Sequence, residues 1–194
     1  MDHESENPAL AVHRHEPGAF DRLVETWEHA LFNYVRRILL NDQDAQEVVQ
    51  DTFIRAHHAL TRQYTAERCA ALALRPWLFR IGRNLAYNKR RDAPGRREEA
   101  LSQAEHPRFR PLVPAVHLVS ELEKREEIAR LDRAIAGLPS ETRELIALRF
   151  IEEMSYGEIA KTTGFTEASL RGKIFRSLRL LRDALAERGN AHAM

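Results

Sequence analysis

The residues of this sequence whose types and spacing best suit a chemical task are cations that follow a predicted tight turn. Residues 156–173, YGEIAKTTGFTEASLRGK, predict a helix, a turn at Gly164 and a second helix over roughly residues 167–185. Glycine adopts the left-handed conformation that a short turn needs, and Leu170 would fill the space between the two helices. In a helix-turn-helix the N-terminal part of the second helix enters the DNA major groove, where arginine and lysine bind guanine edges and phosphates. The side chains expected there are Ser169, Arg171, Lys173 and Arg176.

A second basic segment interleaves cations with aromatic and amide side chains. It spans residues 75–92, RPWLFRIGRNLAYNKRRD. Aromatic rings beside basic groups suit unpaired nucleic-acid bases, which stack on the rings while the charges hold the backbone. Trp77, at the start of an amphipathic helix, is more typical of a core residue, so this interpretation depends on the polar side chains.

The net charge of +1 hides a strong segregation of charge along the chain. Residues 1–28 carry seven acids against two arginines, a net of −5, whereas residues 75–97 carry eight bases against one acid, a net of +7. Residues 171–182 add five bases and no acid. Basic stretches are commonly solvated surfaces, but two separate clusters indicate two places that hold a polyanion.

The composition excludes several other classes of protein. Hydrophobic residues make up 43% and charged residues 30% of the 194 residues, as in a soluble globular protein. Cys69 is the single cysteine, so the chain forms no internal disulfide and no thiolate metal site, which is typical of a reducing compartment. No apolar run approaches the roughly 20 residues of a membrane span, and the acidic N-terminus lacks the pattern of a secretion signal. We therefore expect a cytoplasmic protein with no direct membrane insertion, no cofactor and no metal.

Apolar residues that recur every three and four positions predict the helices which position these groups. The first helix covers residues 20–38, and a second one follows a turn at Asn41 with its apolar face over residues 45–60. A short helical piece is expected within residues 66–73. Pro76 then suits the first turn of the basic helix.

Between these helices and the helix-turn-helix, over residues 93–120, the periodicity fails and four of the eight prolines gather. Proline removes a backbone donor and disfavours helix at the preceding residue, so this segment predicts a linker. Beyond it a helix should end near Gly137, and Ser140 is expected to cap the next one. The sequence thus predicts an all-α protein with two small helical domains, a Pro-rich linker and a C-terminal helix-turn-helix.

The expected boundaries follow from these patterns. They are a flexible N-terminal tail (residues 1–16), a first helical domain (17–92), the linker (93–120), a second helical domain (121–187) and a C-terminal tail (188–194).

These pieces, in this order, resemble the extracytoplasmic-function sigma factors, which are initiation subunits of bacterial RNA polymerase. NDQDAQEVVQDTFIRAHHAL (residues 41–60) resembles the segment that docks on the clamp of the largest polymerase subunit. PWLFRIGRN (76–84) resembles the helix that opens and reads the minus-ten element, and residues 138–185 are similar to the domain that reads the minus-thirty-five element. The resemblance covers residues 17–92 and 121–187, and three motifs in register are far more specific than any one alone.

The resemblance implies a protein that is not an enzyme, that binds core RNA polymerase and promoter DNA, and that an anti-sigma factor holds inactive. It implies that the N-terminal domain captures a flipped base of the melted non-template strand. The residues that match the family's motifs are Asp44, Glu47, Gln50 and Asp51 for polymerase binding, Arg80, Asn84, Asn88, Lys89 and Arg90 for minus-ten DNA, and Ser169, Arg171, Lys173 and Arg176 for minus-thirty-five DNA.

The sequence departs from the family pattern in three places. Gly172 stands where the family often carries a small polar residue, which weakens the helix by about 1 kcal/mol relative to alanine. The linker is basic where the family's is often acidic. Residues 61–74, where a base-capturing loop should lie, match poorly, so the sequence names no base-pocket residues there.

Two other functions would account for parts of the sequence. A helix-turn-helix regulator that acts without polymerase explains the C-terminal half, but leaves the basic helix over residues 76–91 unexplained. A metal-dependent enzyme is suggested only by histidines, of which two are adjacent in sequence and so point to different faces of a helix. These histidines are His13, His15, His57 and His58.

Overall fold

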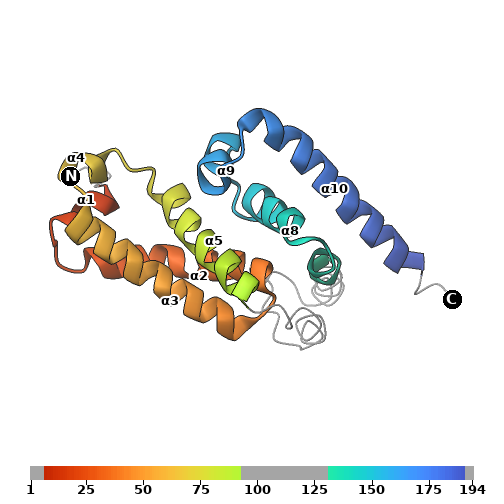
Figure 1. Ribbon diagram of the computed structural model, residues 1–194, viewed down its shortest axis with the longest axis horizontal. Helices are drawn as coiled ribbons and strands as arrows, with labels where there is room; N and C mark the ends of the chain where they lie inside the picture. The colour runs from red at the N-terminus through yellow and green to blue at the C-terminus, as the bar shows by residue number, and fades with distance from the viewer. Residues whose placement is uncertain (1–6, 93–130, 191–194) are drawn as a thin grey trace, which may run out of the picture.

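The structure, a computed structural model, describes residues 7–92 and 131–190, and the regular elements in these two ranges are all helices (Figure 1). The predictions of an all-α fold and of a C-terminal helix-turn-helix are confirmed. The predicted linker (93–120) lies outside the described residues. Among the helices of the two described ranges, none combines the length and the apolar character that a membrane crossing requires.

Three long helices form the N-terminal unit: α2 (Ala19–Leu39), α3 (Asp42–His58) and α5 (Leu74–Asp92). Their apolar stripes face one another, because residues three and four apart lie on the same side of a helix. The connection from α2 to α3 is tight, since Leu40 adopts a left-handed backbone and the Asn41 side chain accepts the N–H of Asp44 at 2.9 Å. The buried residues of these helices include Leu23, Leu31, Tyr34, Val35, Ile38, Val48, Phe53, Leu78 and Phe79.

Gly82 lets α5 approach the other two helices closely. A Cβ at this position would lie 3.0 Å from Leu31 Cδ1 and 3.4 Å from both Thr52 Oγ1 and Val35 Cγ2. These three neighbours are fully buried, so their atoms have little room to move. The close packing of the N-terminal unit therefore depends on the missing side chain.

A short helix, α1 (Pro8–His13), corrects the prediction of a flexible tail from Asn7 onward. The side chain of Asn7 caps this helix and also donates a hydrogen bond to the carbonyl of Ala70 at 2.8 Å. The helix packs against η1 (Ala59–Gln63) and α4 (Ala66–Ala70), the latter lying where a short helical piece was predicted. Its partners are far away in the sequence, so the local pattern could not indicate that this segment would dock.

The C-terminal unit is built from residues 131–136, α8 (Ser140–Ile146), η2 (Ala147–Ile151), α9 (Tyr156–Thr163) and α10 (Glu167–Asn190). The prediction that Ser140 caps a helix is wrong, because Ser140 is the first residue of α8 and Pro139 precedes it without a side-chain cap. The last helix continues to Asn190, so the predicted C-terminal tail (188–194) begins inside a helix.

The two units pack against each other and share one hydrophobic core. Helix α8 lies against α2, and α9 lies against α5 (Figure 1). Leu78 and Phe79 of α5 belong to the same buried cluster as Leu148, Met154 and Ile159 of the C-terminal unit. The sequence predicted two domains but did not predict this packing.

Two glycine-to-alanine substitutions are expected to change stability in opposite directions. Gly82→Ala should destabilise the protein by about 1–2 kcal/mol, because the added methyl group overpacks a buried contact. Gly172→Ala, whose Cβ would meet only Arg176 Nη1 at 3.7 Å, should stabilise the exposed helix α10 by about 0.5–1 kcal/mol. Urea unfolding of both variants measures the two changes, and equal shifts in one direction would contradict the packing around Gly82.

Candidate nucleic-acid interface

The helix-turn-helix is fixed by local hydrogen bonds at both ends of α9. At its start, the Ser155 hydroxyl oxygen accepts the N–H of Glu158 at 3.2 Å, and the Glu158 carboxylate accepts the N–H of Ser155 at 2.9 Å. This reciprocal capping box satisfies two backbone donors of the first turn, and the hydrogen bond from the Ser155 backbone lowers the pKa of Glu158. At its end, Gly164 has φ +82° and donates its N–H to Ala160 O at 2.8 Å. Leu170 is fully buried, as the sequence predicted.

The N-terminal half of α10 carries all four residues predicted to read minus-thirty-five DNA. Ser169, Arg171 and Arg176 are exposed. Lys173 is less free, because its Nζ lies 2.6 Å from Glu141 Oε1 and 4.3 Å above the ring of Phe165. The guanidinium of Arg171 lies 5.6 Å from the centre of the Tyr156 ring on α9, so Arg171 must leave a ring contact and Lys173 must exchange an ion pair to bind a polyanion.

The residues predicted to bind minus-ten DNA lie along α5. Arg80, Asn84 and Asn88 are exposed and follow one another at intervals of four, so they form one stripe on the helix. Arg90 is also exposed, with its guanidinium 4.6 Å from the centre of the Tyr87 ring. This stripe offers two amides and a guanidinium along one line, which suits hydrogen bonds to base edges and phosphates.

Lys89 differs from the other predicted minus-ten residues. Its Nζ lies 2.7 Å from Glu47 Oε2 and 3.3 Å from Asp44 Oδ1, two of the residues predicted to bind polymerase. The hydrogen bond to Glu47 contributes most to the raised pKa of Lys89. Lys89 therefore ties α5 to α3, and the structure joins two sets of residues that the sequence analysis kept apart.

The remaining residues predicted to bind polymerase, Gln50 and Asp51, are exposed on α3 together with Glu47. Beside them, a groove between α2 and α3 is lined mainly by apolar side chains. Its lining includes Phe20, Val24, Phe32, Val49, Phe53 and Ile54. An acidic face next to an apolar groove suits a basic amphipathic helix from another protein.

A hollow between α3, η1 and α5 contains residues that the sequence analysis did not assign to the site. Trp77 Nε1 donates a hydrogen bond to the Tyr64 hydroxyl at 3.1 Å, and the two ring centres are 5.8 Å apart. The guanidinium of Arg68 lies 3.6 Å above the Tyr64 ring. Gln63, Tyr64, Trp77, Asn84 and Asn88 are among the residues that line this hollow.

Trp77 is half-buried, so it packs on the core as predicted and also borders the hollow. The sequence signal for this pair was Tyr64, thirteen positions before Trp77 in a segment that matches the family poorly. Only the packing of η1 beside α5 shows that the two rings are neighbours.

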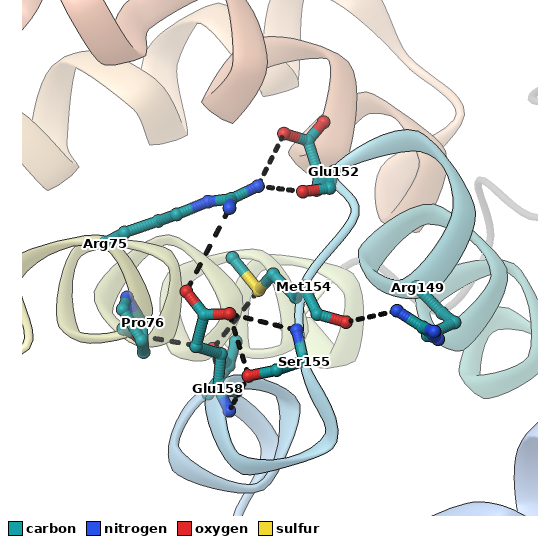
Figure 2. Close-up of polar contacts among 8 residues, drawn as sticks. Arg75, Pro76, Arg149, Glu152, Met154, Ser155 and Glu158 are labelled. Carbon is teal, nitrogen blue, oxygen red and sulfur yellow. Dashed lines mark hydrogen bonds and ion pairs between the residues drawn. The ribbon is translucent and has the colours of Figure 1, made fainter.

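Two arginines of the basic cluster face the C-terminal unit instead of solvent. Arg75 donates to the carbonyl oxygen of Glu152 and lies 3.8 Å from its carboxylate and 4.0 Å from that of Glu158 (Figure 2). Arg83 contacts the carboxylate of Glu144 at 2.6 Å. The positive charge of residues 75–92 is therefore divided between an outward face and an interface within the molecule.

The histidines that suggested a metal site are dispersed. His13 Nδ1 is hydrogen-bonded to Leu60 O at 2.8 Å, and His57 packs edge-on against Phe20. In the part of the chain that the structure describes, no group of three or more His, Cys, Asp or Glu side chains is placed to hold a metal ion.

Comparison with known proteins gives matches to both units. The sigma-70 region 2 model matches residues 23–95, and the sigma-70 region 4 model matches residues 128–181. RNA polymerase sigma-H factor of Pseudomonas aeruginosa is 30% identical over 181 residues, 90% of each chain. The ECF RNA polymerase sigma-E factor of Escherichia coli (strain K12) is 29% identical over 171 residues, 86% of each chain. The structure of CnrH in complex with the cytosolic domain of CnrY is similar with a TM-score of 0.64 and 29% identity, covering 93% of this chain and 96% of that one.

Removing the capping box should destabilise the helix-turn-helix. Ser155→Ala is expected to cost about 1 kcal/mol of unfolding free energy. Glu158→Gln should also destabilise, but only at pH values where the carboxylate is ionised. Because the folded-state pKa of Glu158 is lowered, its stabilisation is present above the unfolded-state pKa and is lost as the pH falls through the folded-state pKa.

Urea unfolding of the Glu158→Gln variant and the wild type between pH 7 and pH 3 tests this. The two curves should converge toward acid pH. A difference that stays constant over this range would exclude the carboxylate as its source.

Proposed function

The chain belongs to the extracytoplasmic-function sigma factors of bacterial RNA polymerase, and from this premise we propose which of its surfaces carry out each step of transcription initiation. A sigma factor binds core RNA polymerase and directs it to promoters. We assign polymerase binding and minus-ten recognition to the N-terminal unit (residues 17–92), and minus-thirty-five recognition to the C-terminal unit (121–187).

One observation carries this assignment. Two separate helices, one in each unit, expose polar and basic side chains: α5 exposes arginines and amides, and the N-terminal half of α10 exposes arginines and a serine. A helix-turn-helix regulator that acts without polymerase needs only the second row. The stripe of Arg80, Asn84 and Asn88 beside an aromatic hollow supports a second, distinct contact with nucleic acid, and the matches to both sigma-70 regions favour the sigma factor over that regulator.

The polymerase contact is assigned to the acidic face of α3 and the apolar groove next to it. Asp51 and Gln50 are exposed there, and Glu47 and Asp44 complete the row while holding Lys89. A helix of the polymerase clamp that carries arginines along an apolar stripe would satisfy both the charge and the groove.

The minus-ten contact is assigned to the outer stripe of α5 and the hollow beside it. Arg80 and Arg90 would hold phosphates, while Asn84 and Asn88 border a hollow that contains Tyr64 and Trp77. An unpaired base can stack on such rings and form hydrogen bonds through its exposed edge, which offsets the few kcal/mol needed to unstack it from the duplex. Lys89 joins this set when it exchanges its carboxylate partners for phosphate.

The minus-thirty-five contact is assigned to Ser169, Arg171, Lys173 and Arg176 at the start of α10. A helix-turn-helix that enters the major groove places these positions against base edges and flanking phosphates. The open surface around Gly172, where a Cβ would have ample room, leaves space for a DNA backbone to approach.

We further propose that the protein works in the cytoplasm, has no catalytic activity of its own, and is held inactive by an anti-sigma factor. The similar structure of CnrH contains a bound protein domain, the cytosolic domain of CnrY. That complex supports a protein partner of the same general kind for this chain.

Binding to core polymerase tests the whole proposal. The purified chain is expected to comigrate with core bacterial RNA polymerase on size exclusion, and Asp51→Arg should weaken the complex at least tenfold because it places a cation against a basic partner. Asp183→Arg, a charge reversal of an exposed acid on α10, is the matched control and should bind normally. If the wild-type chain stays apart from core polymerase yet binds duplex DNA, the sigma assignment fails.

Transcription by reconstituted holoenzyme from a randomised promoter library separates the two DNA contacts. Arg176→Ala should reduce promoter affinity by about 1–3 kcal/mol on duplex templates. Tyr64→Ala should reduce open-complex formation by a similar amount, about 1–3 kcal/mol, because a stacked base is lost. Arg182→Ala, an arginine further along α10 that is exposed and paired with Asp183, is the control for Arg176. Equal losses for Arg176→Ala and Arg182→Ala would contradict a specific role of the first residue.

A further inference from the structure

Glu144 of α8 is fully buried, and its carboxylate accepts four hydrogen bonds from side chains of the other unit. Tyr34 Oη donates to Oε1 at 2.7 Å, and Tyr87 Oη donates to Oε2 at 2.7 Å. Arg83 donates through Nε to Oε1 at 2.6 Å and through Nη2 to Oε2 at 3.4 Å. The side chain of Glu144 has no exposed surface. We call these four residues the Glu144 latch.

The two tyrosine side chains of this cluster favour the protonated form, in which their hydroxyls donate hydrogen bonds. Tyr34 is fully buried, and burial, followed by the charge of Glu144, raises its pKa. The pKa of Tyr87 is raised for the same reasons. Both hydroxyls therefore keep their protons over the physiological range and donate to the carboxylate. A buried carboxylate with four such bonds is well compensated, whereas the same group without them would be strongly disfavoured.

The neighbouring residue, Arg143, provides a second connection between the units. Its Nε donates to Arg37 O at 2.6 Å and its Nη2 to Ile38 O at 3.2 Å, at the C-terminal end of α2. The same guanidinium donates to Ala136 O and Leu138 O in its own unit. A cation at the C-terminal end of a helix is also favoured by the helix dipole. Adjacent residues of opposite charge thus attach α8 to both α2 and α5.

This packed arrangement cannot contact both promoter elements together. Elements named for positions minus ten and minus thirty-five are 25 base pairs apart, which is about 85 Å of duplex. A compact chain of 194 residues has a radius of gyration of about 16 Å, and so a diameter of roughly 40 Å. The 38 residues from 93 to 130 can span at most about 137 Å of extended chain, so the covalent connection permits separation of the units.

We propose that the Glu144 latch keeps the free protein closed, with its two DNA-reading units held together, and that it must open before both units reach the promoter. The claim that the closed state is inactive rests on the proposed function, whereas the closure of the free protein by the latch does not depend on it. Core polymerase binds the units apart and so selects the open state, and its apparent affinity is reduced by the fraction of protein that is closed.

The distance between the units in solution tests the latch without polymerase or DNA. Spin labels at Glu25→Cys on α2 and Asp183→Cys on α10, both exposed positions, with the buried Cys69 replaced by alanine, report this distance in the full chain. The wild-type latch should give one narrow distribution. Glu144→Gln should give a broader distribution with longer distances, since an amide places an NH2 group against donors. The ratio of open to closed protein should rise roughly 10- to 100-fold, as for loss of hydrogen bonds to a charged group.

Two further variants keep the test decisive. Tyr87→Phe removes a single hydroxyl and should shift the distance distribution in the same direction by a smaller amount. This variant tests the latch if circular dichroism shows that Glu144→Gln has lost helix content. Glu141→Gln, three residues away on α8 and paired within its own unit, should leave the distribution unchanged. A narrow, unchanged distribution in both latch variants would overturn the proposal, and so would a wild type that is already broad.

The effect of the latch on polymerase binding is measured in a separate experiment. Glu144→Gln should bind core polymerase more tightly than the wild type, by up to the factor by which its open fraction increases. Wild-type affinity despite an opened distribution would show that the latch does not control polymerase binding. If neither protein binds polymerase, the proposed function fails while the distance result stands.

Discussion

A carboxylate that leaves water must find donors, and in this protein the requirement of Glu144 determines how the two units meet. Tyr34 on α2, and Arg83 and Tyr87 on α5, can all reach that carboxylate only when α8 lies across both helices. The apolar core then closes around the same contact, so that Leu78 and Met154 are part of one cluster. This orientation also determines which side chains stay exposed. Because one stripe of α5 faces the C-terminal unit, the exposed polar side chains lie on the adjacent stripe, the one that we propose contacts nucleic acid.

The helices of this fold could be predicted because each one is specified by residues a few positions apart. The spacing of apolar residues gave α2, α3 and α5, and the glycine at the turn with Leu170 gave the helix-turn-helix. The exposure of the residues proposed to contact DNA also follows from helical geometry once the buried face is known. The failure at Ser140 was also local, since a cap depends on which residue begins the helix. The helix α1 was missed for a different reason, because a short helix depends on what it docks against and these partners lie far away in the sequence.

The interfaces could not be predicted, because charged residues in a sequence read as solvated surface until their partners are known. Arg83 lies 61 positions from Glu144, and Arg75 lies 77 positions from Glu152. Both arginines were counted with the DNA-binding charge. Lys89 shows the same limit over a shorter range, since two acids assigned to another surface hold it. The aromatic hollow was missed for a related reason: Tyr64 and Trp77 come from separate elements that only the packing of η1 on α5 brings together.

The contact between Glu144 and three residues of the other unit also bears on how such a protein can change over generations. Two domains joined by a long linker are expected to recombine freely, since each could be replaced by the corresponding domain of a relative. Here, a C-terminal unit from a relative without an acid at this position would leave an arginine and two tyrosine hydroxyls buried without an acceptor. The two halves of the chain are therefore constrained to evolve as a pair, and a substitution at one of these four positions limits what the other three can become.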